Sequence, residues 1–273
     1  MLIIGEKLNS SIPSSLAAMQ ARDTDALCAL IQAQNEAGAD YLDLNAALVG
    51  GDEVDNLLWL VDLALKNGAK GIVLDSPSPE VLEQALTRAI KARPELGHSE
   101  ETPRVICNSI TLTTAQPGLV EAIAYARAGV VVMPIEGSLL PHSAHGRVAL
   151  AQKMVQTLTA AGVQPGCIFV DIMAQALATT PNAGVTLLQT LQGMRQIPGV
   201  QTVCGLSNIS FGLPGRAKLA ASALTMLLAG NLSAAILDPT SPAIQQALIL
   251  SATILGEDDY CMDYIRAFRE KAL

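Results

Sequence analysis

The sequence is poor in aromatic and charged residues, and this shortage excludes several classes of partner. Only 3% of the residues are aromatic and 15% are charged, with a net charge of −8. A nucleic-acid surface needs clustered Lys and Arg, or aromatic side chains on which bases stack, so we expect no nucleic-acid partner. Half of the residues are hydrophobic, which excludes a disordered chain and predicts a large core of Ala, Val, Ile and Leu.

Long apolar runs and paired cysteines are also missing. No stretch approaches the roughly 18 uninterrupted apolar residues of a membrane span, and the first residues do not have the form of a signal peptide. The five cysteines are dispersed, odd in number and without a CxxC pair, and Cys107 and Cys204 lie within apolar runs. Such cysteines are typical of reduced thiols. These absences predict a cytoplasmic protein with no membrane partner.

Several catalytic motifs are absent as well. The sequence has no GxGxxG, P-loop or GxSxG pattern, and no Lys lies inside the strands predicted below, which argues against a Schiff base. His142 and His145 have the spacing of metal ligands, but only Glu136 is nearby, so two surface histidines are the better interpretation. We expect no metal bound by this chain. The glycines of 212–215 leave a phosphate site as a minor alternative.

What the sequence does contain is a series of short apolar runs spaced through the whole chain. Eight of them are rich in β-branched residues and predict strands: Leu2–Gly5, Tyr41–Leu44, Gly71–Leu74, Arg104–Cys107, Gly129–Met133, Cys167–Val170, Thr202–Gly205 and Ala234–Leu237. The segments between them have helical periodicity, and no linker divides the chain. We therefore predict one domain over residues 1–273, an α/β fold of the (β/α)8 barrel type. A doubly wound open sheet is the alternative.

Two of the predicted helices have clear starting signals. Asp52 precedes a helix in which Val54, Leu58 and Leu65 fall on one face. Ser78 is a second cap, and Pro79 follows it at the first helical position, where its missing N–H costs nothing. Both signals follow a predicted strand, as the alternation of a barrel requires.

Most of the predicted strands lead into an amide or a carboxylate. These residues are Glu6, Asp43, Asn45, Asp75, Asn108, Asp171, Asn208 and Asp238. In a barrel of this type the carboxyl ends of the strands converge on the active site. Any one of these residues taken alone is more often a helix cap than a ligand, but capping does not readily explain the whole set.

A ring of carboxylates and amides without Lys or His suits a flat, neutral ligand rich in N–H donors. A carboxylate accepts two neighbouring N–H bonds, and Asn both donates and accepts. A 2-amino-4-oxo pterin presents that pattern along one edge. Asp75, Asn108 and Asp171 follow the third, fourth and sixth strands and are the candidates for one side of its pocket.

Several sequence segments resemble the methyltetrahydrofolate:corrinoid protein methyltransferases. That family includes the folate domain of cobalamin-dependent methionine synthase and is related in fold to dihydropteroate synthase. The resemblance covers nearly the whole chain. It is carried by MLIIGEKLN (1–9), LDLN (42–45), LDS (74–76), NS (108–109), GLSNISFGLP (205–214), AAILDP (234–239) and the YCMDYIRAFR segment (260–269).

The resemblance implies roles for individual residues. Asp75, Asn108 and Asp171 correspond to residues that hydrogen-bond the pterin edge, and Asn208 to a catalytic Asn that reaches N5, the nitrogen bearing the methyl group. The other residues in motifs that line the site are Glu6, Asn9, Asp43, Asn45 and Ser207. Arg216 receives no firm role, and Phe211 stands where certain members have Gln.

The resemblance also implies a reaction and its partners. The methyl group would move between N5 of methyltetrahydrofolate and the cobalt of a corrinoid, with the direction undetermined. The chain lacks the D-x-H-x-x-G motif that ligates cobalt, so we expect the corrinoid to arrive on a separate protein. Members of the family are commonly homodimers. Two alternatives remain open, a dihydropteroate synthase-like enzyme and a non-catalytic pterin-binding module.

Overall fold

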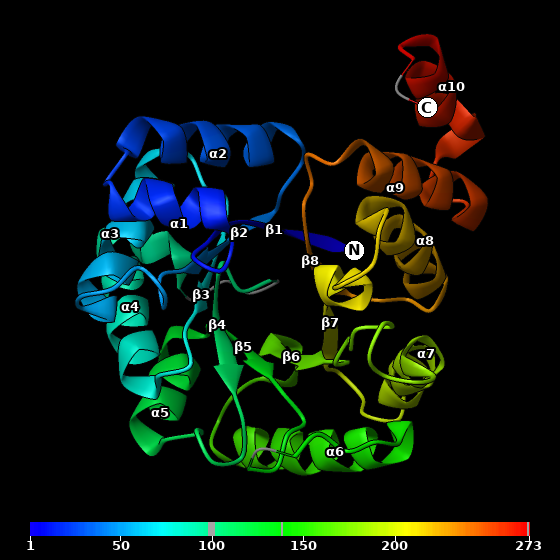
Figure 1. Ribbon diagram of the computed structural model, residues 1–273. Coiled ribbons are helices and arrows are strands. Elements are labelled where there is room, and N and C mark those ends of the chain that lie inside the picture. The colour runs from blue at the N-terminus through cyan, green and yellow to red at the C-terminus, as the bar shows by residue number, and fades with distance from the viewer. Residues whose placement is uncertain (98–101, 138, 272) are drawn as a thin grey trace.

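Eight parallel strands close into a barrel in the order in which they occur in the chain (Figure 1). The structure is a computed structural model that describes residues 1–97, 102–137, 139–271 and 273. The strands are β1 (Leu2–Asn9), β2 (Tyr41–Asn45), β3 (Ile72–Asp75), β4 (Val105–Ile110), β5 (Gly129–Val132), β6 (Ile168–Asp171), β7 (Gln201–Gly205) and β8 (Ala234–Leu237). The predicted fold class and all eight predicted strands are confirmed.

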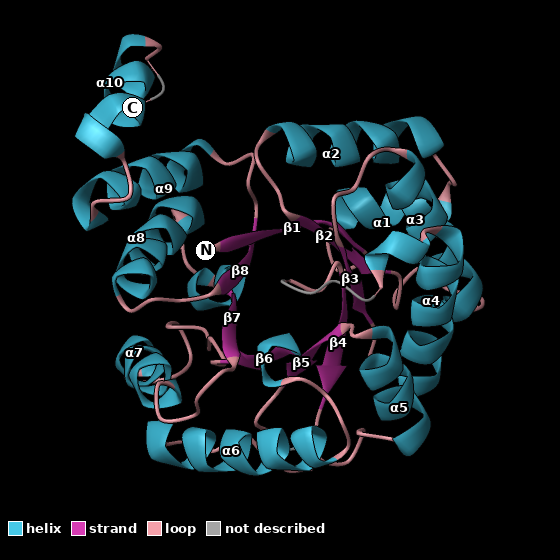
Figure 2. Ribbon diagram, turned by 180° about the vertical axis from the view of Figure 1, so that it is seen from behind, coloured by secondary structure: helices cyan, strands magenta, loops and turns pink. Residues whose placement is uncertain are grey.

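Helices surround the barrel on all sides (Figure 2). They are α1 (Pro13–Gln20), α2 (Thr24–Glu36), α3 (Glu53–Lys66), α4 (Pro79–Ala92), α5 (Pro117–Ala126), α6 (Ala144–Ala160), α7 (Ala183–Met194), α8 (Arg216–Ala229), α9 (Pro242–Leu255) and α10 (Met262–Arg269). Short 3-10 helices are η1 (Pro94–Leu96), η2 (Pro165–Cys167), η3 (Leu206–Ser210) and η4 (Asp259–Cys261). None of the helices among the described residues is long and apolar enough to cross a lipid bilayer.

The helix starts follow from the sequence signals. Asp52 accepts a hydrogen bond from the backbone N–H of Val54 at 2.8 Å, and α3 begins at the next residue. Ser78 accepts from Val81 N–H at 3.4 Å, and Pro79 is the first residue of α4. In both cases the cap satisfies a backbone N–H that has no partner inside the helix.

Two separate apolar cores hold the barrel together. The larger core lies between strands and helices, and Leu8, Leu44 and Cys107 belong to it. The smaller core fills the barrel, with one or two side chains from each strand: Ile4, Tyr41, Val73, Ile106, Val131, Phe169, Val203 and Ala234, flanked by Leu2 and Ile236. Because side chains alternate between the two faces of a strand, the inward-facing positions can be counted onward from this plug.

β1 is longer than predicted, and this corrects one expectation. The strand continues from the apolar run Leu2–Gly5 through Asn9, so Lys7 lies inside a strand after all. Between Gly5 and Leu8, β1 has one more residue than β2, which is a register shift of the β-bulge type. The shift reverses the alternation: Leu8 packs in the outer core, and Asn9 turns toward Asp43. Apolarity ends early in β1 because its second half lines the mouth instead of the core.

Candidate functional site

The predicted polar residues form a layer directly above the apolar plug of the barrel. Five of them lie two residues beyond a plug residue on their strands: Ile4 to Glu6, Tyr41 to Asp43, Val73 to Asp75, Ile106 to Asn108 and Phe169 to Asp171. The register pairs Asn9 with Asn45, Asn45 with Asp75, and Asp75 with Asn108, giving an unbroken row across four strands. Strand alternation therefore brings these side chains to one end of the barrel interior.

The part of this layer on β1, β2 and β3 is joined by side-chain hydrogen bonds. Ser10 Oγ donates to Asn45 Oδ1 at 2.6 Å, and Asn45 Nδ2 donates to Asp75 Oδ2 at 3.0 Å. The backbone N–H of Ala47 also donates to Asn45 Oδ1. The oxygen of Asn45 is thus occupied within the protein, and the structure places Asn45 as a support that orients Asp75.

Asp75 is a half-buried carboxylate with a raised pKa. Burial raises its pKa to about 6, the hydrogen bond from Asn45 lowers it, and the charge of Glu53 raises it. Glu53 itself accepts a 2.6 Å hydrogen bond from the hydroxyl of the buried residue Ser76. At neutral pH Asp75 is mostly ionised and accepts hydrogen bonds.

Asp43 lies deepest, with 1% of its surface exposed. Its Oδ2 accepts from Asn9 Nδ2 at 3.3 Å, and its buried Oδ1 has no partner among the described residues. Burial raises the pKa of Asp43 well above its usual range. The charges of Asp75 and Glu6 raise it further, and the amides of Asn9 and Asn108 oppose the shift. Asp43 is accordingly a buried carboxyl at the base of the mouth whose ionisation is disfavoured.

Glu6 joins the first strand to the segment after the seventh. Its Oε1 accepts a 2.7 Å hydrogen bond from Ser207 Oγ in η3, although 201 residues separate the two. Burial raises the pKa of Glu6, the hydrogen bond from Ser207 lowers it, and Asp238 raises it again. The contact links β1 to η3, which follows β7, across the intervening strand β8.

Asn208 is exposed at the mouth, and its amide makes no hydrogen bond within the part of the chain that the structure describes. It curls back over Gly205, which holds the inward-facing position above Val203 on β7. A Cβ on Gly205 would lie 3.0 Å from Asn208 Nδ2, so the glycine leaves room for this amide. The Asn208 side chain thus lies in the mouth, and its amide is not hydrogen-bonded to any described residue.

Arg216 at the start of α8 supports the turn that carries Asn208. Its Nη2 donates to the carbonyl of Ser207 at 3.1 Å, its Nε lies 3.5 Å from Ser210 Oγ, and its guanidinium stands over the ring of Phe211. No firm role was assigned to Arg216 or Phe211 from the sequence. In the structure, Arg216 connects α8 to η3 on both sides of Asn208.

Lys7 and Asp238 form an ion pair of 2.7 Å on the β1–β8 side. Asp238 also accepts from the backbone N–H and the hydroxyl of Thr240. Burial opposes the ionisation of Asp238, but these hydrogen bonds outweigh it and lower its pKa. Asp238 is thus not a helix cap, since the N-cap of α9 is Ser241, but it orders the turn before that helix, and Lys7 is occupied by an ion pair.

Asp171, the sixth-strand candidate, is held from the opposite side of the barrel. Its Oδ1 accepts a 2.7 Å hydrogen bond from the backbone N–H of Met173. Burial raises the pKa of Asp171 to about 6, while the Met173 hydrogen bond and the charge of Arg147 lower it. Sequence reasoning missed Arg147, because an arginine near a helix start carries no signal that it is buried.

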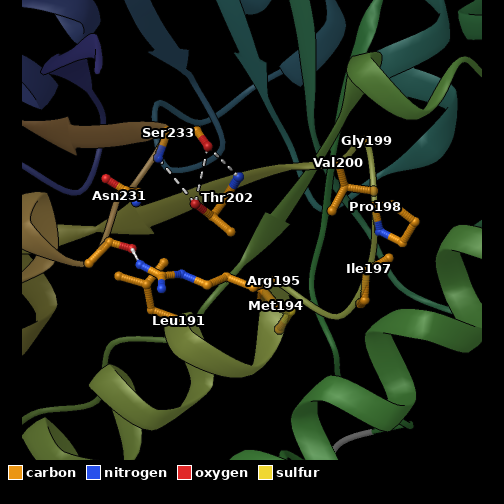
Figure 3. A pocket seen from close by; sticks show the side chains of 11 residues that line it. Leu191, Met194, Arg195, Ile197, Pro198, Gly199, Val200, Thr202, Asn231 and Ser233 are labelled. Atoms are coloured by element: carbon orange, nitrogen blue, oxygen red, sulfur yellow. Dashed lines mark hydrogen bonds between the residues drawn. The ribbon is translucent and has the colours of Figure 1, made fainter.

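A cavity of about 490 Å³ lies at the other end of the barrel, by the amino ends of β7 and β8 (Figure 3). Its polar groups pair with one another: Thr202 and Ser233 bond to each other's backbone N–H, and Arg195 donates to the carbonyl of Gly230. Active sites of this fold lie at the carboxyl ends of the strands. This cavity therefore does not belong to the predicted site.

His142 and His145 are exposed. Within residues 1–97, 102–137, 139–271 and 273, no group of three or more His, Cys, Asp or Glu side chains is arranged to hold a metal ion.

The fold and the mouth together define a class of protein, a TIM barrel whose strand ends present carboxylates and amides to a common centre. Within that class, the chain belongs to the family of pterin binding enzymes, which matches residues 5–238.

Two individual relatives show which members of this family the chain is similar to. The chain is 29% identical over 271 residues to the methylcorrinoid:tetrahydrofolate methyltransferase of Eubacterium limosum, covering 99% of this chain and 97% of that protein. It is 27% identical over 226 residues to the methionine synthase of Mycobacterium tuberculosis, covering 78% of this chain and 18% of that protein. The resemblance to the methyltetrahydrofolate:corrinoid protein methyltransferases is thereby confirmed.

Solved structures agree on the fold. Dihydropteroate synthase from Xanthomonas albilineans in complex with 7,8-dihydropteroate superposes with a TM-score of 0.69 at 17% identity, over 93% of each chain. The Yersinia pestis enzyme with a pterine-sulfa conjugate gives 0.68 at 14% identity. At these identities the likeness concerns the barrel alone.

Proposed function

We propose that this protein is a methyltransferase that moves a methyl group between N5 of methyltetrahydrofolate and the cobalt of a corrinoid carried by a separate protein. The observation that carries the proposal is the polar layer above the plug, where Asp75, Asn108 and Asp171 share one end of the barrel interior. The relative from Eubacterium limosum, whose name pairs a methylcorrinoid with tetrahydrofolate, matches over nearly the full length of both chains.

In this proposal Asp75, Asn108 and Asp171 hold the pterin edge. Asp75 and Asp171, with pKa values of about 6, are mostly ionised at neutral pH and accept the N–H groups of a 2-aminopyrimidinone. The Asn108 amide supplies both a donor and an acceptor. Burying a carboxylate is costly without a partner, so a ligand that donates two N–H bonds restores what burial removes.

Asn208 is proposed to act at N5. A tertiary amine leaves poorly unless its nitrogen gains a proton or a hydrogen bond as the C–N bond breaks, and the proton that N5 of tetrahydrofolate carries afterwards comes from solvent. The Asn208 amide has no useful pKa, so it serves as a donor whose bond strengthens as N5 becomes basic. Its exposure and the absence of a hydrogen-bond partner for the amide among the described residues support this role, because the amide need not break another bond to reach the ligand.

The carboxyl-end loops support docking of a corrinoid protein. Large apolar side chains are exposed on four of the loops that follow strands: Leu48, Leu139, Leu177 and Phe211. Backbone pairing of Leu177 with Ile209 joins two of these loops. A methyl group bound in the mouth is accessible only from this side, so the partner would bring the cobalt over these residues.

The proposal includes a homodimer in the cytoplasm, as the resemblance implies. Exposed apolar side chains at the C-terminal end of the chain support the dimer: Ile254, Leu255, Tyr260, Met262 and Phe268. Figure 1 shows α10 at the edge of the molecule, beyond α9. All five cysteines are free thiols, which suits a reducing compartment. Sedimentation at micromolar concentration checks the dimer.

The reaction is tested with free cobalamin in place of the corrinoid protein. The protein mixed with methyltetrahydrofolate and cob(I)alamin should form methylcobalamin, and with methylcobalamin and tetrahydrofolate it should form methyltetrahydrofolate. Tight folate binding without turnover in either direction would instead identify a non-catalytic pterin-binding module.

The same preparation excludes or supports the dihydropteroate synthase alternative. That chemistry needs basic side chains to hold a diphosphate, and here Lys7 is paired with Asp238 while Arg216 donates to Ser207. Incubation with a pterin diphosphate and 4-aminobenzoate should therefore yield no dihydropteroate.

A further inference from the structure

Arg147 is buried to a degree unusual for an arginine. Only 1% of it is exposed, although it lies in the first turns of a helix, α6, on the outside of the barrel. Its guanidinium has three bonded acceptors on two different loops: Nε donates to the carbonyl of Pro141 at 3.0 Å, Nη1 donates to that of Met173 at 3.0 Å, and Nη2 donates to Gln175 Oε1. Pro141 belongs to the loop after β5, and the other two belong to the loop after β6.

The loop after β6 is the one that orients Asp171. Both backbone polar groups of Met173 are hydrogen-bonded: its N–H donates to Asp171 Oδ1, and its carbonyl accepts from Arg147. Met173 also has φ of 61°, in the left-handed region that non-glycine residues rarely adopt. Such a conformation persists only where its surroundings fix it. The two hydrogen bonds of Met173 supply that fixation.

We propose that Arg147 is a positioning residue for pterin binding, which acts through Met173 and Gln175 to hold the Asp171 carboxylate in the mouth. The inference rests on the proposed function insofar as Asp171 is a ligand of the pterin. Arg147 does not contact the reacting atoms. Its planar fork spans three acceptors at once, which the single ammonium of a lysine does not do.

The charges around Asp171 provide a measurable quantity, the pKa of Asp171, that a purely structural role of Arg147 would not change. The groups that interact electrostatically with Asp171 among the described residues are Arg147 on α6 and the Cys204 thiol on β7. Burial raises the pKa of Cys204, and so does the charge of Asp171, so that this thiol stays neutral. Arg147 is therefore the cation that favours the ionised form of Asp171, in addition to the larger effect of the Met173 N–H.

The test compares Arg147→Met with Arg93→Met. Arg93 is a matched control: it also donates to two backbone carbonyls, those of Ala69 and Leu65, but it does so at the amino ends of the strands. Affinity for methyltetrahydrofolate is measured by titration calorimetry from pH 5 to 8. Arg147→Met should bind about tenfold more weakly at pH 7.5, and its loss of binding on acidification should begin about one pH unit higher. Arg93→Met should keep the wild-type affinity and pH profile.

Two milder variants separate the bracing from the charge and remain informative if Arg147→Met does not fold. Gln175→Ala leaves the cation in place, so it should weaken binding a few-fold with the wild-type pH midpoint. Arg147→Lys should likewise keep the midpoint but not the affinity, because one ammonium cannot hold all three acceptors.

Carbon-13 NMR of the ligand-free protein gives a measurement that needs no folate. The Asp171 carboxyl resonance, assigned by its disappearance in Asp171→Asn, should titrate at higher pH in Arg147→Met than in the wild type. If Asp171→Asn weakens folate binding while Arg147→Met and Gln175→Ala do not, the positioning role is wrong and the proposed function stands. If the wild type does not bind folate, the proposed function fails, while the NMR titration still decides the link between Arg147 and Asp171.

Discussion

The two halves of the barrel mouth are built differently. On β1, β2 and β3, Asn9, Asn45 and Asp75 belong to side-chain hydrogen-bond pairs that fix them before any ligand arrives. On the β7 side, Asn208 is exposed, and its amide makes no hydrogen bond to the described residues. The side chains of the first half are therefore held in one geometry without a ligand, and the second half presents the Asn208 amide, which is free to form a new hydrogen bond.

In the proposed function, this difference assigns ligand binding to the first half of the mouth and the methyl-transfer step to the second. Side chains held in one geometry lose little freedom when a ligand docks, so the fixed half suits recognition of a rigid ring. A donor without an internal partner suits a bond that becomes strong only as the reaction proceeds. The comparison predicts that variants in the two halves will affect different kinetic constants.

The largest effect is expected at Asn208. Asn208→Ala should lower the methyl-transfer rate by roughly 10²–10³-fold, the range found when a single donor to a developing charge is removed. Folate affinity should change little, because the amide contributes mainly in the transition state. Single-turnover kinetics with cob(I)alamin and a separate binding titration check the two constants. A loss of affinity with an unchanged rate would reverse the assignment of the two halves.

Acidification should weaken folate binding by about 100-fold between pH 7 and 5. Two carboxyls with pKa values of about 6, Asp75 and Asp171, each pass from mostly ionised to mostly protonated over this interval. Titration calorimetry across the range measures the effect. A pH-independent affinity would show that neither carboxylate accepts a bond from the ligand.

The same carboxyls act on stability with the opposite sign. Because the folded-state pKa of Asp75 is raised, its contribution to stability is fully present below the unfolded value near 3.8 and is lost as pH rises through 6. Ligand-free wild type should therefore gain stability relative to Asp75→Asn as pH falls from 7 to 4. Denaturant unfolding of both proteins at several pH values checks this slope.

Removal of Asp75 should reduce affinity more than rate. Asp75→Ala removes a charged acceptor, worth about 1.5–3 kcal/mol, so folate binding should weaken by roughly 10- to 150-fold. The rate at saturating folate should fall far less than in Asn208→Ala. Asp62, which pairs with Arg88 on the outer helices, provides a control, and Asp62→Ala should leave both constants unchanged.

The smallest effect is expected at Arg216, which supports η3, the turn that carries Asn208. Arg216→Met removes an exposed hydrogen bond to the carbonyl of Ser207, and such contacts contribute about 0.5–1 kcal/mol. The methyl-transfer rate should fall by a few-fold, and folate affinity should hold. An effect as large as that of Asn208→Ala would mean that Arg216 itself acts on the substrate.

The positions of the polar residues in the mouth could be predicted from the sequence, whereas the hydrogen bonds between them could not. Period-two alternation places Asp43, Asp75 and Asn108 two positions beyond apolar plug residues, and that much follows from strand geometry. Partners such as Ser10 with Asn45 depend on which strands are neighbours and at what register, which a single sequence does not encode locally. Asn45 was predicted to line the site, and it proves to support Asp75.

Long-range contacts of charged side chains were not predictable at all. Lys7 was placed outside the strands because the apolar run stops at Gly5, whereas β1 continues beyond it. Arg147 is separated from Met173 and Gln175 by the rest of α6 and by β6, and nothing near it in sequence marks it as buried. The helix caps, which depend on residues two or three positions apart, were predicted correctly.

The register shift in β1 has a consequence for how such barrels can diversify. In a regular strand, odd and even positions face opposite sides, and a change of strand length by one residue exchanges them. The extra residue between Gly5 and Leu8 has made that exchange in the middle of β1, so that both Glu6 and Asn9 serve the mouth. Without the bulge, a β1 strand of the same length would turn Asn9 outward, whereas deletion of Lys7 would restore regular alternation with Glu6 and Asn9 both still facing the mouth. A bulge can thus accommodate a single inserted residue while the mouth contacts on both sides of it are kept.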